Sequence, residues 1–238
     1  MLNINTLRSV THGILTIGSD PGIIQSIIDF DFLAGKKSPS IKAIFATGRN
    51  VERYFFGQKE ILIPVFSSLE AIPTTLRKQL TFFLNLSSGR RVFSLSAEVI
   101  RTFPDILGGV VFAEQVPEQH ALALGTVAKE TKKLLIGPAS IGLLLPGHLK
   151  LGAIGGVDVK QLVDAHLFTK GSVAVLSASG GMTNEILTTV ISSGKRISFS
   201  LSFGGERFPL TSPKEAFLLA ENDPETETIV YFGELGGT

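Results

Sequence analysis

Two glycine-rich turns are the segments of this sequence best suited to hold an anionic group such as a phosphate. The first, Gly18-Ser-Asp-Pro-Gly22, follows an apolar run at residues 13–17, and the second, Ser177-Ala-Ser-Gly-Gly-Met-Thr-Asn-Glu185, follows another at 172–176. A helix that begins directly after such a turn presents free backbone N–H groups to an anion. Each turn also fits a simpler interpretation, in which its glycines and caps serve only the fold.

The second turn offers the better anion site. Gly180 and Gly181 have no side chains, so an anion can approach the backbone closely, and Ser179 can cap the following helix. We expect Asn184 and Glu185 to lie in the first turns of that helix, within reach of a bound group. Neither turn matches the GxGxxG or GxxxxGKS/T patterns of nucleotide-binding loops.

Charged residues follow other expected strands. Arg90 and Arg91, which follow the strand at 81–86, could pair with phosphate oxygens in a bidentate manner. As loop residues, the two arginines could equally be solvated. Glu114 and Glu234 each come directly after a strand and could orient a substrate or a histidine. They also fit carboxylates that only favour the start of a helix.

The composition excludes several classes of function. The chain has no cysteine, which excludes disulfides, thiolate catalysis and cysteine-based zinc sites. No paired-ligand spacing occurs among its four histidines, so we expect no metal site; they are His12, His120, His148 and His166. A formal net charge of +1 gives no reason to expect binding to nucleic acid or to an anionic membrane. With no signal-like or membrane-spanning apolar run, the sequence predicts a soluble cytoplasmic protein.

The elements that position these turns alternate between strands and helices. Strands are expected at 13–17, 41–46, 61–66, 81–86, 109–113 and 133–136, with helices at 23–33 and from 67 or 68 to about 80, and a polar loop at 47–53. Pro64 favours an edge or irregular position for its strand. This order predicts an α/β fold with a mostly parallel sheet covered on both faces. In such a sheet the loops after the strands meet at one edge, where ligands bind.

A boundary is expected at Gly137-Pro138, which gives domains at 1–137 and 138–238. The glycine-rich and proline-rich segment 137–156 reads as a structured connection. The second unit then has strands at 172–176, 196–203 and 228–232 and helices at 182–193 and 212–220. Because three strands are few for a doubly wound domain, we expect this second domain to be truncated, or its open edge to be covered by a partner chain.

Several stretches of the chain, in order and over nearly its whole length, resemble ATP-citrate lyase, and more loosely the succinyl-CoA synthetase α-subunit. They include Phe55-Phe-Gly-Gln-Lys-Glu-Ile-Leu-Ile-Pro-Val-Phe66, Ala113-Glu-Gln-Val-Pro-Glu118, Ser179-Gly-Gly-Met-Thr-Asn-Glu185, Gly204-Gly-Glu-Arg-Phe-Pro209 and Gly233-Glu-Leu-Gly-Gly-Thr238. The resemblance implies a Rossmann-like CoA-binding domain followed by a flavodoxin-like domain of the acyl-CoA synthetase type.

The resemblance also implies a role for each candidate residue. CoA, the expected cofactor, would be contacted by Gly18, Ser19, Asp20, Ser88 and Arg90. The helix start at Ser179, Gly180 and Gly181 would hold a phosphoryl group carried by a histidine, and Glu114 and Glu234 would lie around that histidine. In the family, citryl-CoA forms through phosphohistidine and citryl-phosphate. An ATP-grasp subunit or domain supplies the nucleotide, and a citrate-synthase-like domain cleaves the product, so we expect an oligomeric assembly.

Three departures from the family pattern limit this interpretation. The phosphorylated histidine lies downstream of Thr238 in the family, in a Gly-His-Ala-Gly context that this sequence lacks. Ala178 stands where the family has an arginine, and the loop 47–53 is shortened. We therefore expect a CoA-binding module that is inactive alone. Two alternatives stay open: a non-catalytic regulatory or scaffold protein that retains the fold, and a succinyl-CoA synthetase α-like subunit that acts on another acid.

Overall fold

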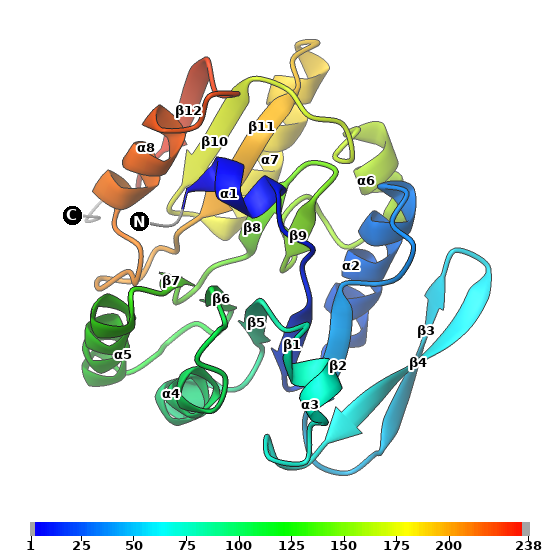
Figure 1. Cartoon of the computed structure of the whole chain (residues 1–238). Coiled ribbons are helices and arrows are strands. Elements are labelled where there is room, and N and C mark those ends of the chain that lie inside the picture. Colours follow the sequence, from blue (N-terminus) through cyan, green and yellow to red (C-terminus); the bar gives the residue numbers. More distant parts are fainter. Residues whose placement is uncertain (1–2, 235–238) are drawn as a thin grey trace.

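The chain forms two β-sheets that lie one above the other, with helices around and between them (Figure 1). The computed structural model describes residues 3–234. All strands up to Ile136 belong to the first sheet, and all strands from Gly142 onward belong to the second. No helix in the described range is long and apolar enough to cross a membrane. The expected mixed α/β fold is confirmed, and it consists of two sheets.

The first sheet has seven strands in the order β3-β4-β2-β1-β5-β6-β7, parallel except for β3, which pairs with β4 in the antiparallel direction. Its strands are β1 (Ile14–Ile17), β2 (Ile41–Phe45), β3 (Val51–Phe56), β4 (Lys59–Phe66), β5 (Phe82–Asn85), β6 (Gly108–Val111) and β7 (Leu134–Ile136). The chain winds outward from β1 through β2 and then returns to place β5 on the other side of β1. The direction of winding therefore reverses between β1 and β5, which makes this point a topological switch.

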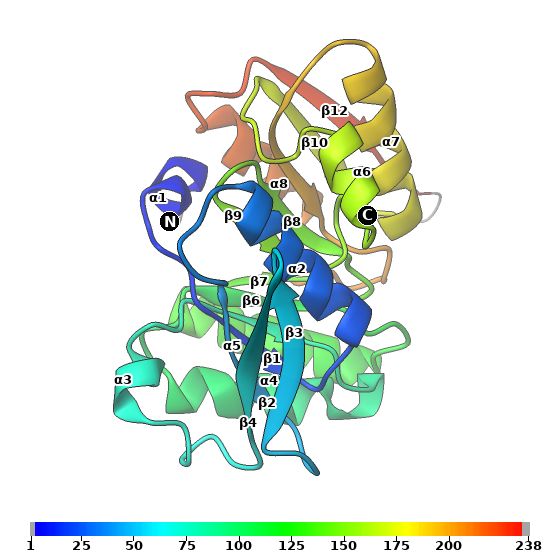
Figure 2. The ribbon, with the colours of Figure 1, turned by 90° about the vertical axis from the view of Figure 1, so that its right-hand side faces the viewer.

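The helices cover the first sheet on both faces. They are α2 (Pro21–Leu33), α3 (Thr74–Arg77), α4 (Val92–Thr102) and α5 (Glu118–Thr131), with a short 3-10 turn at Gly89–Arg91. Helix α1 (Ile4–Arg8) precedes β1 in the chain but lies beside the second sheet (Figure 1). Helices α4 and α5 pack together on one face, and α2 lies on the face that is turned toward the second sheet (Figure 2). Helix α2 begins where it does because Asp20 caps it and Pro21 occupies its first position.

The second sheet has five strands in the order β12-β10-β11-β8-β9. Its elements are β8 (Gly142–Leu145), β9 (Leu149–Leu151), α6 (Val159–Asp164), β10 (Val173–Ser177), α7 (Gly180–Ser192), β11 (Ile197–Ser202), α8 (Pro213–Glu221) and β12 (Thr228–Phe232). The expectation of three strands was wrong, because the segment 137–156 forms the antiparallel hairpin β8–β9. Gly147 makes the tight turn of this hairpin with a φ of +75°, and the N–H of His148 donates to the carbonyl of Leu145.

Two further expectations for the first sheet were wrong in detail. The predicted loop at 47–53 is shorter, because β3 begins at Val51 and pairs with β4 around a turn at Gly57. Pro64 is accommodated because it lies opposite Val51 of β3, while β4 pairs with β2 only at Val65 and Phe66. A helix was predicted from 67 or 68 to about 80, but the structure has only the short helix α3 in this segment. Since a proline disfavours helical geometry in the residue before it, the helix begins only after Pro73.

The two sheets share one hydrophobic core. Ile24 and Ile27 of α2 are fully buried in the same cluster as Leu143 of β8 and Leu149 of β9. A polar contact joins the same elements, because the fully buried Lys150 of β9 reaches into α2. Its Nζ donates to Ser26 Oγ at 2.9 Å and to the carbonyl of Gly152 at 2.8 Å. Helix α2 is therefore packed between the sheets and belongs to both.

Candidate functional site

The turn after β1 lies at the switch point of the first sheet. Gly18 has a φ of +82°, a left-handed conformation that favours glycine, and its N–H donates to the carbonyl of Phe45 at 2.9 Å. Ser19 Oγ donates to Glu52 Oε2 at 2.7 Å, and Asp20 Oδ1 accepts from the N–H of Ile23 at 3.0 Å. The polar side chains of this turn thus hold the turn and the start of α2 in place.

The loop after β5 completes the switch point. A Cβ atom on Gly18 would lie 3.5 Å from the carbonyl carbon of Leu86, so the loops after β1 and β5 are in contact. Ser88 and Arg90 lie in this second loop, and both are exposed. On its other side Gly89 packs against the backbone of Glu114, where a Cβ atom would meet the carbonyl oxygen at 2.9 Å. The structure therefore brings the predicted CoA-binding residues together along one edge of the sheet.

A cleft of about 460 Å³ opens where loops of both sheets meet, and we call it the glutamate cleft. Five predicted site residues line it: Glu114, Ser179, Gly180, Gly181 and Glu234. The other lining residues are Phe112, Gln115, Ala139, Ser140, Ile141, Ala178, Gly205 and Glu206. Residues more than a hundred positions apart in the sequence thus form a single site.

The N-terminus of α7 forms one wall of the glutamate cleft. Ser179 occupies the N-cap position, and its side chain makes no capping hydrogen bond. The first N–H of α7 bonded to a carbonyl of this turn is that of Thr183, which leaves the preceding N–H groups free of partners within the helix. Nothing lies within 4 Å of the position of a Cβ atom on Gly181, so the space in front of the helix is open. This wall suits an anion.

Carboxylates also line the glutamate cleft. Glu114 and Glu234 are exposed, and Glu234 Oε2 would lie 2.5 Å from a Cβ atom on Gly205. Glu206 Oε1 accepts from the N–H of Gln115 at 2.7 Å, which joins the loop after β6 to the loop after β11. Among the residues that the structure describes, no lysine or arginine lines the cleft. Within residues 3–234, no group of acidic or histidine side chains is placed to hold a metal ion.

Glu206 was missed by the sequence analysis, although it lies in the segment Gly204–Pro209 that carries part of the resemblance. Its only signal was its place after an apolar strand that ends in two glycines. Its partner Gln115 has a φ of +54°, which is unusual for a residue with a side chain, and the bond from Glu206 supports that conformation.

The expectation for Asn184 was wrong. Its Oδ1 accepts from the N–H of Gly155 at 2.8 Å, so this side chain points toward the segment before α6 and does not reach the glutamate cleft. Glu185 does not line the cleft either. The helical periodicity of 3.6 residues carries both side chains away from the end of α7.

None of the four histidines lines the glutamate cleft. His12 is buried in the segment between α1 and β1, with Nε2 placed 2.8 Å from the carbonyl oxygen of Leu7, and burial lowers its pKa to about 4. Burial also lowers the pKa of His148, which lies in the turn between β8 and β9. Both histidines have structural surroundings rather than a place in the site.

Comparison with known proteins identifies clear relatives, although no protein-family model matches the chain. A probable ATP-citrate synthase subunit 1 of Schizosaccharomyces pombe is 32% identical over 222 residues, which are 92% of this chain and 36% of that protein. The ATP-citrate synthase beta chain protein 1 of Arabidopsis thaliana is 34% identical over 215 residues, 90% of this chain and 35% of its own length. The chain thus spans about a third of the relatives it matches.

Solved structures agree with the sequence comparison. The ATP citrate lyase of Methanothrix soehngenii, in complex with citrate and coenzyme A, has a TM-score of 0.90 and 28% identity, covering 96% of this chain and 37% of that one. A dinucleotide-forming acetyl-coenzyme A synthetase 1 of Ca. Korarchaeum cryptofilum shares the fold, with a TM-score of 0.67 and 18% identity over 94% of this chain and 44% of that one. The resemblance to ATP-citrate lyase is confirmed.

Proposed function

From a similarity to ATP-citrate synthases that covers nine-tenths of the chain, we propose that it is the CoA-binding module of an ATP-citrate lyase-like enzyme. The first domain, 1–137, binds CoA, and the second, 138–238, contributes to a phosphohistidine site. The whole enzyme forms an acyl-CoA from an acid, ATP and CoA. Citrate is the acid suggested by the relatives, and an ATP-grasp subunit or domain is the expected partner.

The observation that carries this proposal is the position of the predicted CoA-binding residues. Gly18 and Arg90 lie in the two loops that flank the switch point between β1 and β5. In open α/β sheets, ligands bind outside the carboxyl ends of the strands at such a point. Pro21 has no N–H and Asp20 accepts from the N–H of Ile23, so the N–H of Gly22 is the group at the start of α2 that would face the phosphates of CoA. The exposed guanidinium of Arg90 would pair with a phosphate oxygen.

The glutamate cleft is the proposed place of phosphoryl transfer. The N–H groups at the start of α7 would bind the phosphoryl oxygens, while Glu114 and Glu234 would accept hydrogen bonds from the imidazole that carries the group. The acid attacks phosphorus, the bond to the histidine breaks, and the thiol of CoA then displaces phosphate from the acyl phosphate. None of the four histidines is among the described residues that line the cleft, which supports our proposal that another histidine carries the phosphoryl group.

Calorimetric titration with CoA tests the proposal. We expect saturable binding with one site, and we expect Arg90→Ala to weaken it roughly tenfold to a hundredfold, the range of a lost charge-assisted hydrogen bond. Arg101→Ala is the matched control, because Arg101 is also exposed but lies at the far end of α4. No binding at millimolar CoA, or equal losses in the two variants, would contradict the proposal. The chain alone should transfer no phosphate from ATP.

A further inference from the structure

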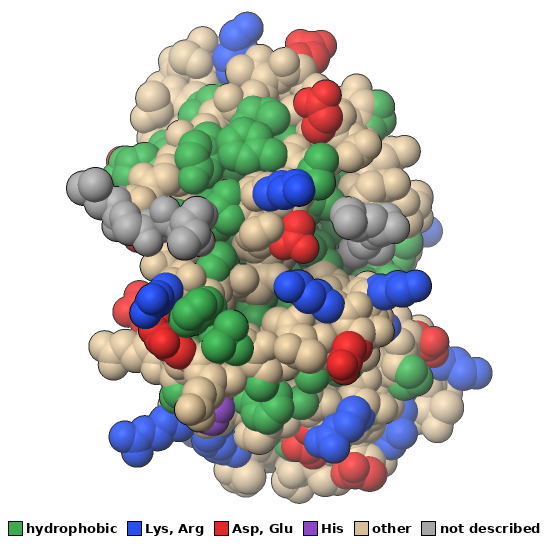
Figure 3. All heavy atoms as spheres, turned by 90° about the vertical axis from the view of Figure 1, so that its left-hand side faces the viewer, with side chains coloured by type: hydrophobic (Ala, Val, Ile, Leu, Met, Phe, Trp, Pro, Cys, Tyr) green, Lys and Arg blue, Asp and Glu red, His purple; other side chains and the backbone are tan. Residues whose placement is uncertain are grey.

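A second hollow lies between the two sheets, on the side where α5 and α8 face each other. Its volume is about 590 Å³, and we call it the lysine cleft. It is lined by Leu107, Ala128, Lys129, Lys132, Lys133, Leu134, Leu135, Leu210, Thr211, Glu215 and Leu219, none of which lines the glutamate cleft. Figure 3 views the molecule from this side, with basic side chains next to apolar ones near its waist.

The floor of the lysine cleft is apolar. Five leucines from both halves of the chain line it, and two of them, Leu135 and Leu219, are buried, with exposed fractions of 1% and 6%. Leu210 and Thr211 already occupy the nearby edge of the first sheet. The N–H of Leu210 donates to the carbonyl of Gly137 at 2.7 Å, and the side-chain hydroxyl of Thr211 donates to the carbonyl of Leu135 at 2.6 Å. These two carbonyl groups are therefore not available to pair with an added β-strand.

The rim of the lysine cleft carries positive charge. Three lysines line it against one carboxylate, that of Glu215. Glu215 Oε2 already accepts from the N–H and the hydroxyl of Ser212, both at 2.7 Å, in the cap of α8. Lys133 Nζ donates to the carbonyl of Pro104. Lys129 and Lys132 are exposed, and in the described range no ion pair involves either of them.

We propose that the lysine cleft binds an anionic amphiphile, namely a carboxylate on a medium-length alkyl chain. The leucine floor would bury the chain, because apolar surface gains from leaving water. The ammonium groups of Lys129 and Lys132 would hold the carboxylate at the rim, and their alkyl stems would extend the apolar wall. The cleft has the size of an ordinary small-molecule pocket, and the combination of apolar walls with a few charged groups is typical of one.

Titration of the 238-residue chain with decanoate below its micelle concentration tests this site. We expect saturable binding of one equivalent, weakened at least tenfold by the double substitution Lys129→Glu/Lys132→Glu. The control Lys160→Glu/Lys195→Glu makes the same change of net charge at exposed lysines outside the cleft, and it should leave decanoate affinity unchanged. No saturable binding, or the same loss in both double variants, overturns the proposal.

Two further measurements separate this site from adsorption of a surfactant. Decanol, which has the same chain without the charge, should bind at least tenfold more weakly than decanoate. Leu210→Ser changes the half-buried floor and should weaken decanoate while CoA affinity stays at the wild-type value, which also verifies the fold. Equal affinity for decanol and decanoate, or unchanged decanoate affinity in Leu210→Ser, counts against the site.

Discussion

At the scale of single residues, Lys150 is the most unusual side chain of the molecule. It is fully buried, and burial lowers the pKa of its ammonium group to about 7, although Asp31 and Asp29 of α2 act in the opposite direction. The Asp31 carboxylate forms its hydrogen bonds with other groups: it accepts from Lys36 Nζ at 2.6 Å and from the backbone N–H and the hydroxyl of Ser40. Lys150 therefore gains two hydrogen bonds, and within residues 3–234 it has no close ion pair.

This environment predicts a pH dependence of stability. An unfolded lysine keeps its proton to about pH 10.4, while Lys150 in the folded chain loses its proton near pH 7. Between these values the unfolded state binds more protons, so Lys150 makes the free energy of unfolding rise with pH by up to about 1.4 kcal/mol per unit. Urea unfolding at pH 7 and pH 9 should show wild type gaining roughly 2–3 kcal/mol relative to Lys150→Met.

The variant Lys160→Met is the control for this prediction. Lys160 is exposed on α6, so Lys160→Met should keep the pH dependence of the wild type. Parallel stability curves for wild type and Lys150→Met would mean that Lys150 keeps an ordinary pKa when buried. The comparison does not require Lys150→Met to be as stable as the wild type, since only the difference between two pH values enters.

Single residues also mark how far the sequence could predict the site. The positions of Gly18, Ser179 and Glu234 at strand ends or helix starts could be predicted, because a parallel sheet brings its carboxyl ends together. Their roles stay predictions. Asn184 was misplaced because its partner, the N–H of Gly155, lies in a segment whose path depends on the tertiary fold. Glu206 was missed for the same reason, since its partner Gln115 is distant in sequence.

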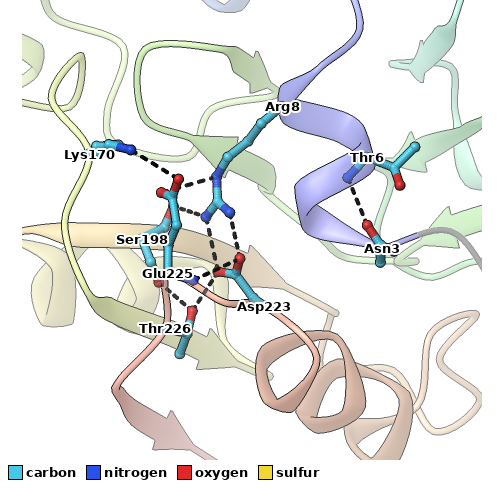
Figure 4. Close-up of polar contacts among 8 residues, drawn as sticks. All are labelled: Asn3, Thr6, Arg8, Lys170, Ser198, Asp223, Glu225 and Thr226. Carbon is cyan, nitrogen blue, oxygen red and sulfur yellow. Dashed lines mark hydrogen bonds and ion pairs between the residues drawn. The ribbon is translucent and has the colours of Figure 1, made fainter.

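At the scale of elements, helix α1 fastens the start of the chain to the second sheet (Figure 4). Arg8 NH1 and NH2 donate to the two oxygens of Asp223 at 2.5 and 2.9 Å, and NH2 also donates to the carbonyl of Ser198 at 3.1 Å. Glu225 adds a weaker ion pair at 3.5 Å, and Thr226 Oγ1 donates to Asp223 at 2.6 Å. Both partners of the main pair are buried, with exposed side-chain fractions of 6% and 0%.

Breaking this pair should destabilise the whole chain. Arg8→Met leaves the buried carboxylate of Asp223 without its cation, which typically costs about 3–5 kcal/mol at neutral pH. Burial alone would raise the pKa of Asp223, but hydrogen bonds from Arg8 and Thr226 bring it below its usual value. The contribution of the pair is therefore present at neutral pH and is lost as the pH falls below about 4.

Denaturant unfolding at pH 7 and at pH 3.5 measures both effects. The difference between wild type and Arg8→Met should shrink at the lower pH. The double variant Arg8→Met/Asp223→Asn should recover part of the loss at pH 7, because it removes the uncompensated charge. If the single and double variants are equally unstable at pH 7, the ion pair is not the source of the effect.

The elements also show which local signals were sufficient. Helix α2 was predicted at 23–33 because its isoleucines recur at helical spacing after the turn at 18–22. The structure begins it two residues earlier, at Pro21, because Asp20 caps it. The hairpin β8–β9 was missed because its strands are fully buried and only three and four residues long. A short apolar run next to glycines and prolines is equally consistent with a strand and with a connecting loop. The pairing of β8 with β11, a strand far along the chain, decides its conformation.

At the scale of the whole molecule, the two sheets are joined more tightly than the predicted boundary at Gly137-Pro138 suggests. The core between them contains fully buried residues of both, including Ile27 of α2 and Leu149 of β9. Arg8 and Lys150 add polar contacts across the same junction. Separating the two sheets would expose apolar surface and would remove Arg8 and Lys150 from their hydrogen-bond partners. Unfolding of one half alone is therefore unfavourable in free energy. The division into domains at 1–137 and 138–238 stays a prediction.

We therefore expect both halves to unfold in one cooperative transition, and the two tyrosines of the chain can report on it. Tyr54 lies in β3 of the first sheet and Tyr231 in β12 of the second, and there is no tryptophan to mask them. Tyr231→Phe leaves tyrosine fluorescence that reports only on the first sheet, and Tyr54→Phe leaves a signal from the second. In each variant the fluorescence midpoint should coincide with the midpoint by far-ultraviolet circular dichroism. A fluorescence transition that separates from the dichroism curve in either variant would mean that the sheets fold independently. The shared core would then be too weak to couple the loops after β1 and β5, which we propose bind CoA, to the glutamate cleft.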